Sequence, residues 1–198
     1  MVKTIHLVRH GHHALLNSRL CGRMPGIGLD ELGCRQVARC AQFLVPPPCA
    51  IRSSPQQRAR QSAGILATRF GLEVEIAPAM DEIDLGEWSG RSFDELNDDP
   101  AWMRWNSRRG ESRPPNGESM RSLQQRVVEH LEEFRKDAGD GTVVIVSHAE
   151  PIRAALLHYL RMPLDDFTSI EVAPAGISTL SVERAGIVIA GMNQGVPA

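Results

Sequence analysis

The chain has 198 residues, 42% of them hydrophobic and 23% charged, and its formal net charge is -2 at pH 7. This length allows one domain to bury a substantial core without disulfides or metals. The near-neutral charge favours neither a nucleic acid nor a membrane as partner, and no apolar run approaches the roughly 20 residues of a membrane span. Four cysteines without close pairing and no signal peptide lead us to expect free thiols and a soluble, cytoplasmic protein.

The first part of the chain alternates short apolar runs with segments of helical periodicity. Proline and glycine mark the ends of these segments. The pattern predicts three strands, over 4–9, 49–54 and 73–78. It also predicts two helices. The first covers 31–44 with Asp30 as its N-cap, and the second has Pro55 in its first turn and ends at Gly71.

The second part begins with a segment rich in proline, glycine, arginine and tryptophan, residues 90–118, which we interpret as a lid or insertion over a pocket. A continuous apolar run over 141–148 predicts a central strand buried on both faces. Around it we predict a helix from Ser119 to near Gly139, a helix with Pro151 in its first turn, and a terminal hairpin of strands over 178–183 and 187–191.

Strands that alternate with helices indicate an α/β fold, a three-layer α/β/α sandwich with a mostly parallel mixed sheet. We expect a single domain over 1–198. In such sheets ligands bind beyond the carboxyl ends of the strands. His10 and His148 both lie at that end of a predicted strand.

Five sequence motifs occur along the chain in a defined order. They are LVRHG at 7–11, SSPQQRARQSA at 53–63, DEIDLGEWSG at 81–90, PPNGES at 114–119 and VSHAEPIR at 146–153. In this order they resemble the histidine phosphatase (phosphoglycerate mutase-like) superfamily, and PPNGES is similar to a stretch common in its phosphatase branches. The resemblance covers most of the chain and implies a phosphoglycerate mutase-like fold.

The resemblance also implies a role for individual residues. His10 is the nucleophile, Glu82 donates a proton to the leaving group, and His148 is the second active-site histidine. The groups implied to bind the phosphate are the side chains of Arg9, Asn17 and Arg58 and the backbone amide of Ala149. Relatives often have glycine where Ala149 stands, so its methyl group narrows the pocket.

These residue types suit phosphoryl transfer on chemical grounds. A phosphomonoester is a dianion near neutral pH, and arginine forks hold its oxygens while staying charged. An imidazole attacks phosphorus only through an unprotonated nitrogen, so a carbonyl should accept the hydrogen on the other nitrogen of His10. His148 at a helix N-terminus can stabilise the same charge. A phosphate dianion nearby should raise the pKa of Glu82 towards neutrality.

Several alternatives remain open at this stage. His10, His12 and His13 could form a metal cluster, although no suitably spaced carboxylate or cysteine accompanies them. Many relatives carry an acidic residue in place of His12 and Ser or Thr in place of His13. Asp81, Asp84 and Glu87 compete with Glu82 as the acid. Three tryptophans either pack or form a stacking platform for a substrate; they are Trp88, Trp102 and Trp105. Four arginines of the lid either face solvent or cap an acidic substrate tail; they are Arg104, Arg108, Arg109 and Arg113.

The predicted function is therefore a metal-independent phosphatase that hydrolyses phosphomonoesters through a phosphohistidine and needs no cofactor. A phosphoglycerate mutase-type phosphotransferase, a catalytically inactive phosphoester-binding domain and a metallohydrolase are the alternatives. We expect a small phosphorylated metabolite as substrate, with a phosphoprotein as the other possibility. The sequence predicts neither the natural substrate nor the oligomeric state.

Overall fold

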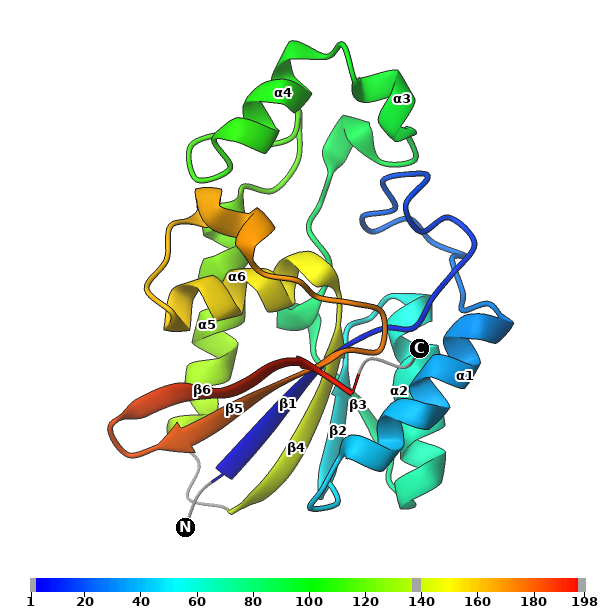
Figure 1. The fold of residues 1–198 in the computed structure, drawn as a ribbon, viewed down its shortest axis with the longest axis vertical. Coiled ribbons are helices and arrows are strands. Elements are labelled where there is room, and N and C mark those ends of the chain that lie inside the picture. Colours follow the sequence, from blue (N-terminus) through cyan, green and yellow to red (C-terminus); the bar gives the residue numbers. More distant parts are fainter. Residues whose placement is uncertain (1–2, 137–139, 196–198) are drawn as a thin grey trace.

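The computed structural model describes residues 3–136 and 140–195, and one mixed six-stranded sheet forms its centre (Figure 1). The strand order is β3-β2-β4-β1-β5-β6. The strands are β1 (Lys3–Arg9), β2 (Ala50–Ser53), β3 (Val74–Ile76), β4 (Gly141–Ser147), β5 (Ile177–Glu183) and β6 (Gly186–Gln194). The first four run parallel, whereas β5 is antiparallel to β1 and β6 to β5, so the predicted mostly parallel mixed sheet is confirmed.

Helices cover both faces of this sheet. The main helices are α1 (Glu31–Cys40), α2 (Gln57–Phe70), α5 (Met120–Lys136) and α6 (Ala149–Tyr159). Val144 and Val146 of β4 pack in one core cluster with side chains of α1 and α2, whereas Val143 and Ile145 pack in the other with side chains of α5 and α6. The central strand β4 is therefore buried on both faces, as its continuous apolar run predicts.

Helix α1 is shorter than the segment predicted over 31–44. The Asp30 side chain caps it, accepting from the Gly33 amide at 2.8 Å. The α-helix ends at Cys40, and Ala41–Phe43 continue it as a 3₁₀ turn. Such tightening is common at helix ends, and prolines follow directly in this chain.

Helix α2 begins two residues later than predicted. Pro55 lies outside it, because Gln56 has the extended backbone of an N-cap and the Ser54 hydroxyl accepts from the Gln56 amide at 3.3 Å. The prediction that Pro55 occupies the first turn is wrong for this reason. Gly71, with a φ of 67°, ends the helix at the predicted place.

The remaining predicted elements are present with small shifts at their ends. Strand β3 is shorter than 73–78, and Pro151 lies in the first turn of α6 as predicted. Helix α5 starts at Met120, and its predicted end near Gly139 lies outside the described residues. No helix in the described parts of the chain has the length and apolarity needed to cross a membrane.

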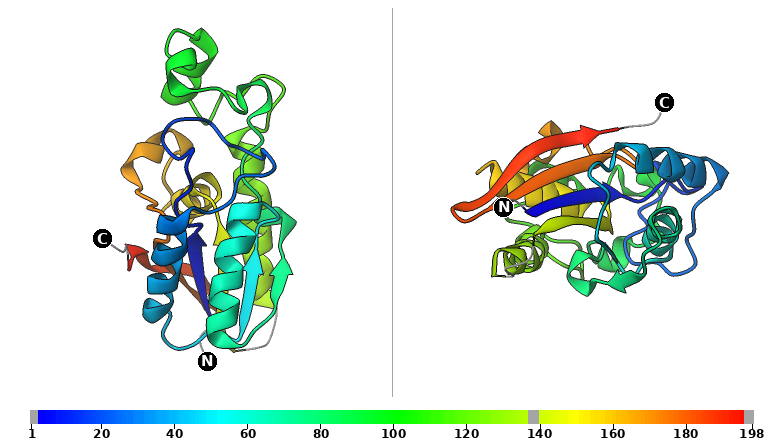
Figure 2. Two further views of the ribbon diagram at one scale, coloured as in Figure 1. Left: turned by 90° about the vertical axis from the view of Figure 1, so that its right-hand side faces the viewer. Right: turned by 90° about the horizontal axis from the view of Figure 1, so that it is seen from below.

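The segment over 90–118 extends beyond the carboxyl ends of the parallel strands (Figure 2, left). It contains α3 (Phe93–Leu96) and α4 (Pro100–Ser107), each with a capping side chain in front of it. Trp88 anchors this segment, because its ring meets those of Trp102 and Trp105 edge to face with centroids 5.3 and 6.1 Å apart. That this segment is a lid within a single domain stays a prediction.

Gly86 joins the loop that follows β3 to the PPNGES motif. Its φ is +51°, and a Cβ there would lie 2.1 Å from the Pro115 carbonyl oxygen. The neighbouring Glu87 amide donates to that same oxygen at 3.1 Å. The loop and the motif are therefore packed too closely for any side chain at this position.

We expect Gly86→Ala to lower the free energy of unfolding by about 2 kcal/mol or more, since left-handed strain and the clash add together. Urea denaturation measures the change. Gly64→Ala is the matched control, because nothing lies within 4 Å of a Cβ there. In helix α2 that change should stabilise the protein by about 0.5–1 kcal/mol. A Gly86→Ala protein as stable as the wild type would contradict the packing described above.

Candidate active site

The candidate site lies where β1 and β4 end side by side. His10 follows β1, and His148 follows β4 as the N-cap residue of α6. Because these parallel strands are neighbours in the sheet, the two imidazole rings meet edge to face with centroids 5.1 Å apart. Both rings are buried.

One ring nitrogen of His10 is fixed as a donor, and the other is an acceptor that faces Arg58. Nδ1 lies 2.8 Å from the Gly11 carbonyl oxygen and donates its hydrogen there, while Nε2 accepts from Arg58 Nε at 3.3 Å. Burial, together with the charges of Arg9 and Arg58, holds the pKa of His10 well below its ordinary value. The ring is therefore neutral, with an unprotonated Nε2.

Arg9 and Arg58 place two guanidinium groups beside His10. Arg58 is 1% exposed, and one of its terminal nitrogens donates to the Gly22 carbonyl at 2.8 Å. Arg9 donates to the Val172 carbonyl at 2.6 Å. These carbonyls orient both side chains while leaving other N–H groups of the same forks available.

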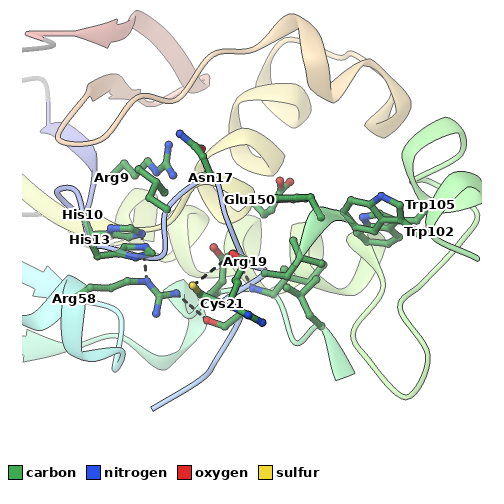
Figure 3. Close-up of a pocket in the computed structure, with 18 of the residues that line it drawn as sticks. Arg9, His10, His13, Asn17, Arg19, Cys21, Arg58, Trp102, Trp105 and Glu150 are labelled. Carbon is green, nitrogen blue, oxygen red and sulfur yellow. Dashed lines mark hydrogen bonds between the residues drawn. The ribbon is translucent and has the colours of Figure 1, made fainter. Parts of the chain in front are cut away.

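Several buried nitrogens at this end of the cavity have no hydrogen-bond partner in the described part of the chain. They are Arg9 Nε, Arg58 Nη1, His13 Nδ1 and His148 Nδ1. A buried donor without an acceptor costs about 1–3 kcal/mol, so a cluster of them indicates a ligand that supplies acceptors. The N-terminus of α6, which starts at Ala149, adds backbone amides to the same wall (Figure 3).

His148 is held by its neighbour across the sheet. The Ser54 hydroxyl lies 2.7 Å from Nε2 of His148, and the Nδ1 atom without a partner lies 3.9 Å from Glu82 Oε2. The same Ser54 hydroxyl donates to Asp81 Oδ1 at 3.2 Å, so its one hydrogen does not decide which nitrogen of the His148 ring is protonated. Ser54 stands within the SSPQQRARQSA motif, but the sequence analysis assigned it no role.

Glu82 is a largely buried carboxyl group in the cavity wall. Oε1 accepts from the Ile83 amide at 2.9 Å. Burial is the main cause that raises the pKa of Glu82 to about 7, with the charge of Glu150 adding to it and that of Arg58 opposing it. This group can hold or release a proton near neutral pH. Asp81, a competing candidate in the sequence, instead accepts from Gln56 at 2.9 Å and holds the Glu82 amide at 2.8 Å.

Two arginines that the sequence analysis did not select hold the backbone at Glu82. Arg23 Nε and Arg126 Nη2 donate to the Glu82 carbonyl at 2.8 and 3.2 Å. Glu118 accepts from both arginines, with two bonds from Arg126 at 2.7 and 3.0 Å. Glu118 belongs to the PPNGES motif, so this motif fixes the loop that carries the acid.

Glu150 is a second carboxylate in the cavity wall, and the sequence analysis missed it. Its oxygens accept from Arg109 at 2.9 Å and Arg153 at 2.7 Å. Arg109 in turn stacks on Phe167, with its guanidinium carbon 3.5 Å from the ring centroid. This pair ties the segment after α4 to the helix that starts at His148. The sequence alone does not indicate the ion pair between Arg109 and Glu150, because 41 residues separate them along the chain.

Apolar side chains form the rest of the cavity wall. They include Leu16, Leu20, Leu85, Phe93, Trp102 and Trp105. Figure 3 shows Trp102 and Trp105 across the cavity from His10 and Arg58. Trp105 is buried in the core, whereas Trp102 is partly exposed. One tryptophan therefore serves mainly packing, and the other also presents a surface to a ligand.

Three of the residues considered in the sequence make other contacts. Asn17 is exposed at a positive φ of 63°; it lines the cavity without a hydrogen bond to any described residue. His12 pairs with Asp30 at 2.5 Å, away from His10. His13 lies beside His10, with ring centroids 5.3 Å apart. In the described residues, no group of three or more His, Cys, Asp and Glu side chains is arranged to hold a metal ion.

Comparison with known proteins gives consistent matches. The family model of the histidine phosphatase superfamily (branch 1) matches residues 5–195. Phosphoserine phosphatase 1 of Hydrogenobacter thermophilus is 34% identical over 199 residues, covering 98% of this chain and 92% of that protein. A bifunctional protein of Mycobacterium tuberculosis is 33% identical over 162 residues, covering 80% of this chain; this chain spans 43% of its length. The solved phosphoserine phosphatase of Entamoeba histolytica with 3-phosphoglyceric acid is 29% identical, with a TM-score of 0.86 and coverage of 98% and 100%.

The raised pKa of Glu82 makes folding stability depend on pH in a defined direction. Below pH 4.5, the ordinary pKa of the group, folded and unfolded chains both hold the proton and the contribution of Glu82 is fully present. Between pH 4.5 and about 7 only the folded chain holds it, so this contribution is lost as the pH rises. The loss amounts to about 3 kcal/mol at about 1.4 kcal/mol per pH unit.

Glu82→Gln should abolish this dependence, because the amide does not titrate. Urea denaturation of both proteins from pH 4.5 to 8 gives the difference in their free energies of unfolding, in which the other titrating groups cancel. We expect the free energy of unfolding of the variant to rise relative to that of the wild type as the pH increases from 4.5 to about 7. Glu129→Gln, at an exposed position on α5, is the control. A difference that stays constant with pH would show that Glu82 titrates normally.

Proposed function

The chain belongs to the histidine phosphatase superfamily, and on this premise we propose that it hydrolyses phosphomonoesters through a phosphohistidine on His10. The observation that carries the proposal is the cluster of buried N–H donors without acceptors around an unprotonated His10 Nε2. A phosphoryl group supplies the missing acceptors. Positive charge from Arg9, Arg58 and the α6 N-terminus takes the place of a metal ion, so no metal or other cofactor is needed.

In the first step, Nε2 of His10 attacks phosphorus in line with the ester oxygen. The bond between phosphorus and that oxygen breaks, and Glu82 gives its proton to the leaving alcohol. His148, whose ring lies beside that of His10, stabilises the negative charge that is concentrated on the transferring group. The raised pKa of Glu82, about 7, keeps a sufficient fraction of this carboxyl protonated at neutral pH.

In the second step, the ionised Glu82 takes a proton from water. The water oxygen attacks phosphorus, the bond to Nε2 of His10 breaks, and inorganic phosphate is released. The same carboxyl group therefore acts as acid and then as base. Arg9 and Arg58 stay bound to the phosphoryl oxygens through both steps.

We propose a small phosphorylated metabolite as substrate, with an apolar surface on its alcohol portion. The wall that faces the leaving group consists largely of aromatic and aliphatic side chains. Two charged groups that line the same cavity, Arg109 and Glu150, already pair with each other at 2.9 Å. Contact with Trp102 therefore favours an alcohol that buries apolar area.

The decisive experiment measures phosphate release from p-nitrophenyl phosphate and 3-phosphoglycerate with excess chelator, for the wild type and His10→Ala. We expect chelator-resistant turnover in the wild type and a loss of at least about a hundredfold in the variant, since the nucleophile is gone. A phosphorylated wild-type protein, trapped by rapid quench and located at His10 by mass spectrometry, is the direct readout.

Each other outcome identifies a different function. Formation of 2-phosphoglycerate without phosphate release would indicate a mutase. Ester binding without turnover by any substrate would indicate an inactive binding domain. Turnover lost on adding chelator would favour a metallohydrolase. Activity above a tenth of the wild type in His10→Ala would remove His10 from the role of nucleophile.

Trp102→Ala tests the apolar leaving-group wall. We expect kcat/KM for phenyl phosphate to fall about tenfold, as an aromatic leaving group loses about 1.5 kcal/mol of apolar contact. Inhibition by inorganic phosphate should not change, because the phosphate end is intact. Met103→Ala is the control, since Met103 lies on the same helix and is 58% exposed. Equal losses for phenyl phosphate and for a methyl ester would rule out this contact.

A further inference from the structure

His13 is a buried imidazole at the phosphate end of the cavity, and the two reaction steps assign it no role. It is 3% exposed and lines the cavity together with His10 and Arg58. Its ring lies at an angle of 35° to that of His10 (Figure 3). The His10 ring therefore has an imidazole neighbour on two sides, with centroids 5.3 Å away for His13 and 5.1 Å away for His148.

His12 fixes the backbone that carries His13. The His12 amide donates to Gln36 at 3.0 Å, and its carbonyl accepts from the Asp30 amide at 3.3 Å. A Cβ on Gly33 would lie 2.1 Å from the His12 carbonyl oxygen, so the loop is in direct contact with α1. The backbone next to His13 is consequently held against helix α1.

The Nδ1 atom of His13 is buried and has no hydrogen-bond partner in the described part of the chain. Positive groups surround the ring: Arg9 on β1 and Arg58 on α2, with His12 next to it and Asp30 the one carboxylate nearby. Burial first, and then Arg58 and Arg9, lower the pKa of His13 to about 4, so the ring is neutral in the free protein. Among these neighbours no atom accepts a hydrogen from Nδ1, whereas an anion between the arginines would.

We propose that His13 is an additional ligand of the phosphoryl group and donates its Nδ1 hydrogen to a phosphoryl oxygen. This inference rests on the proposed phosphatase function of the same cavity. The bond forms with the bound ester and persists on the phosphohistidine, whose charge stays beside His10. His13 thereby supplies a donor at a position where many relatives have the shorter Ser or Thr.

Sulfate binding to the resting protein tests this role without requiring turnover. Sulfate has the shape of phosphate and keeps its double negative charge from pH 6 to 8, so its affinity at pH 7, measured by calorimetry, reports the donors alone. His13→Leu keeps an apolar side chain and removes the donor. His13→Asn carries an amide N–H close to the place of Nδ1.

We expect His13→Leu to weaken sulfate binding about tenfold or more, as for the loss of a hydrogen bond to a charged acceptor. His13→Asn should stay within about threefold of the wild type. His158→Leu is the control and should bind as the wild type does, because His158 is exposed near the far end of α6. Thermal melting of each variant shows whether it is folded.

Two outcomes would overturn the proposal. Unchanged sulfate affinity in His13→Leu would show that His13 does not touch the anion. Equal weakening in His13→Leu and His13→Asn, with both proteins folded, would show that the ring fills space and does not donate. Failure of the phosphatase proposal would be seen separately. A wild-type protein that binds sulfate but hydrolyses no ester would contradict the proposed hydrolysis. The sulfate affinities would still report whether His13 donates to the anion.

Discussion

A dianion can be held inside a protein only where fixed N–H groups and positive charges replace the water that it loses on binding. In this chain, N–H groups and positive charges of this kind lie at the carboxyl ends of β1 and β4. Buried nitrogens of Arg9, Arg58, His13 and His148 have no hydrogen-bond partner in the described part of the chain. Such unmet hydrogen bonds cost stability, which the rest of the structure has to supply. The sheet does so, because β4 is buried on both faces.

The chemistry of Glu82 follows from the same low-polarity surroundings. Burial of this carboxyl group raises its pKa to about 7, so its protonated and ionised forms are both populated near neutral pH. Its backbone cannot relax into solvent, because Arg23 and Arg126 hold the Glu82 carbonyl and Glu118 holds both arginines. The PPNGES motif thus positions Glu82 through Glu118, although none of the motif's side chains is among those that line the cavity.

The segment over 90–118 lines the cavity with Phe93, Trp102, Trp105 and Arg109, on the side away from His10 and Arg58 (Figure 3). It brings aromatic side chains over the cavity, and Arg109 ties it to Glu150 on α6. A salt bridge between largely buried partners stabilises little in itself, but leaving either partner alone would be costly. The pair therefore fixes where the aromatic wall of the cavity lies relative to the N-terminus of α6.

The sequence by itself determined the order of strands and helices, the two-sided burial of β4 and the presence of His10, Arg9, Arg58, Glu82 and His148 in recognisable motifs. Periodicity reports local burial, and motifs report residues that lie close together in the chain. Helix ends were less predictable: Pro55 fell outside α2 because the Ser54 hydroxyl forms a local turn. Only the tertiary structure decided that His12 pairs with Asp30 while His13 faces His10, that Glu118 supports Glu82, and that Arg109 reaches Glu150. These pairs join residues from different loops and helices, and their distances are set by how the layers pack on the sheet, which no local pattern records.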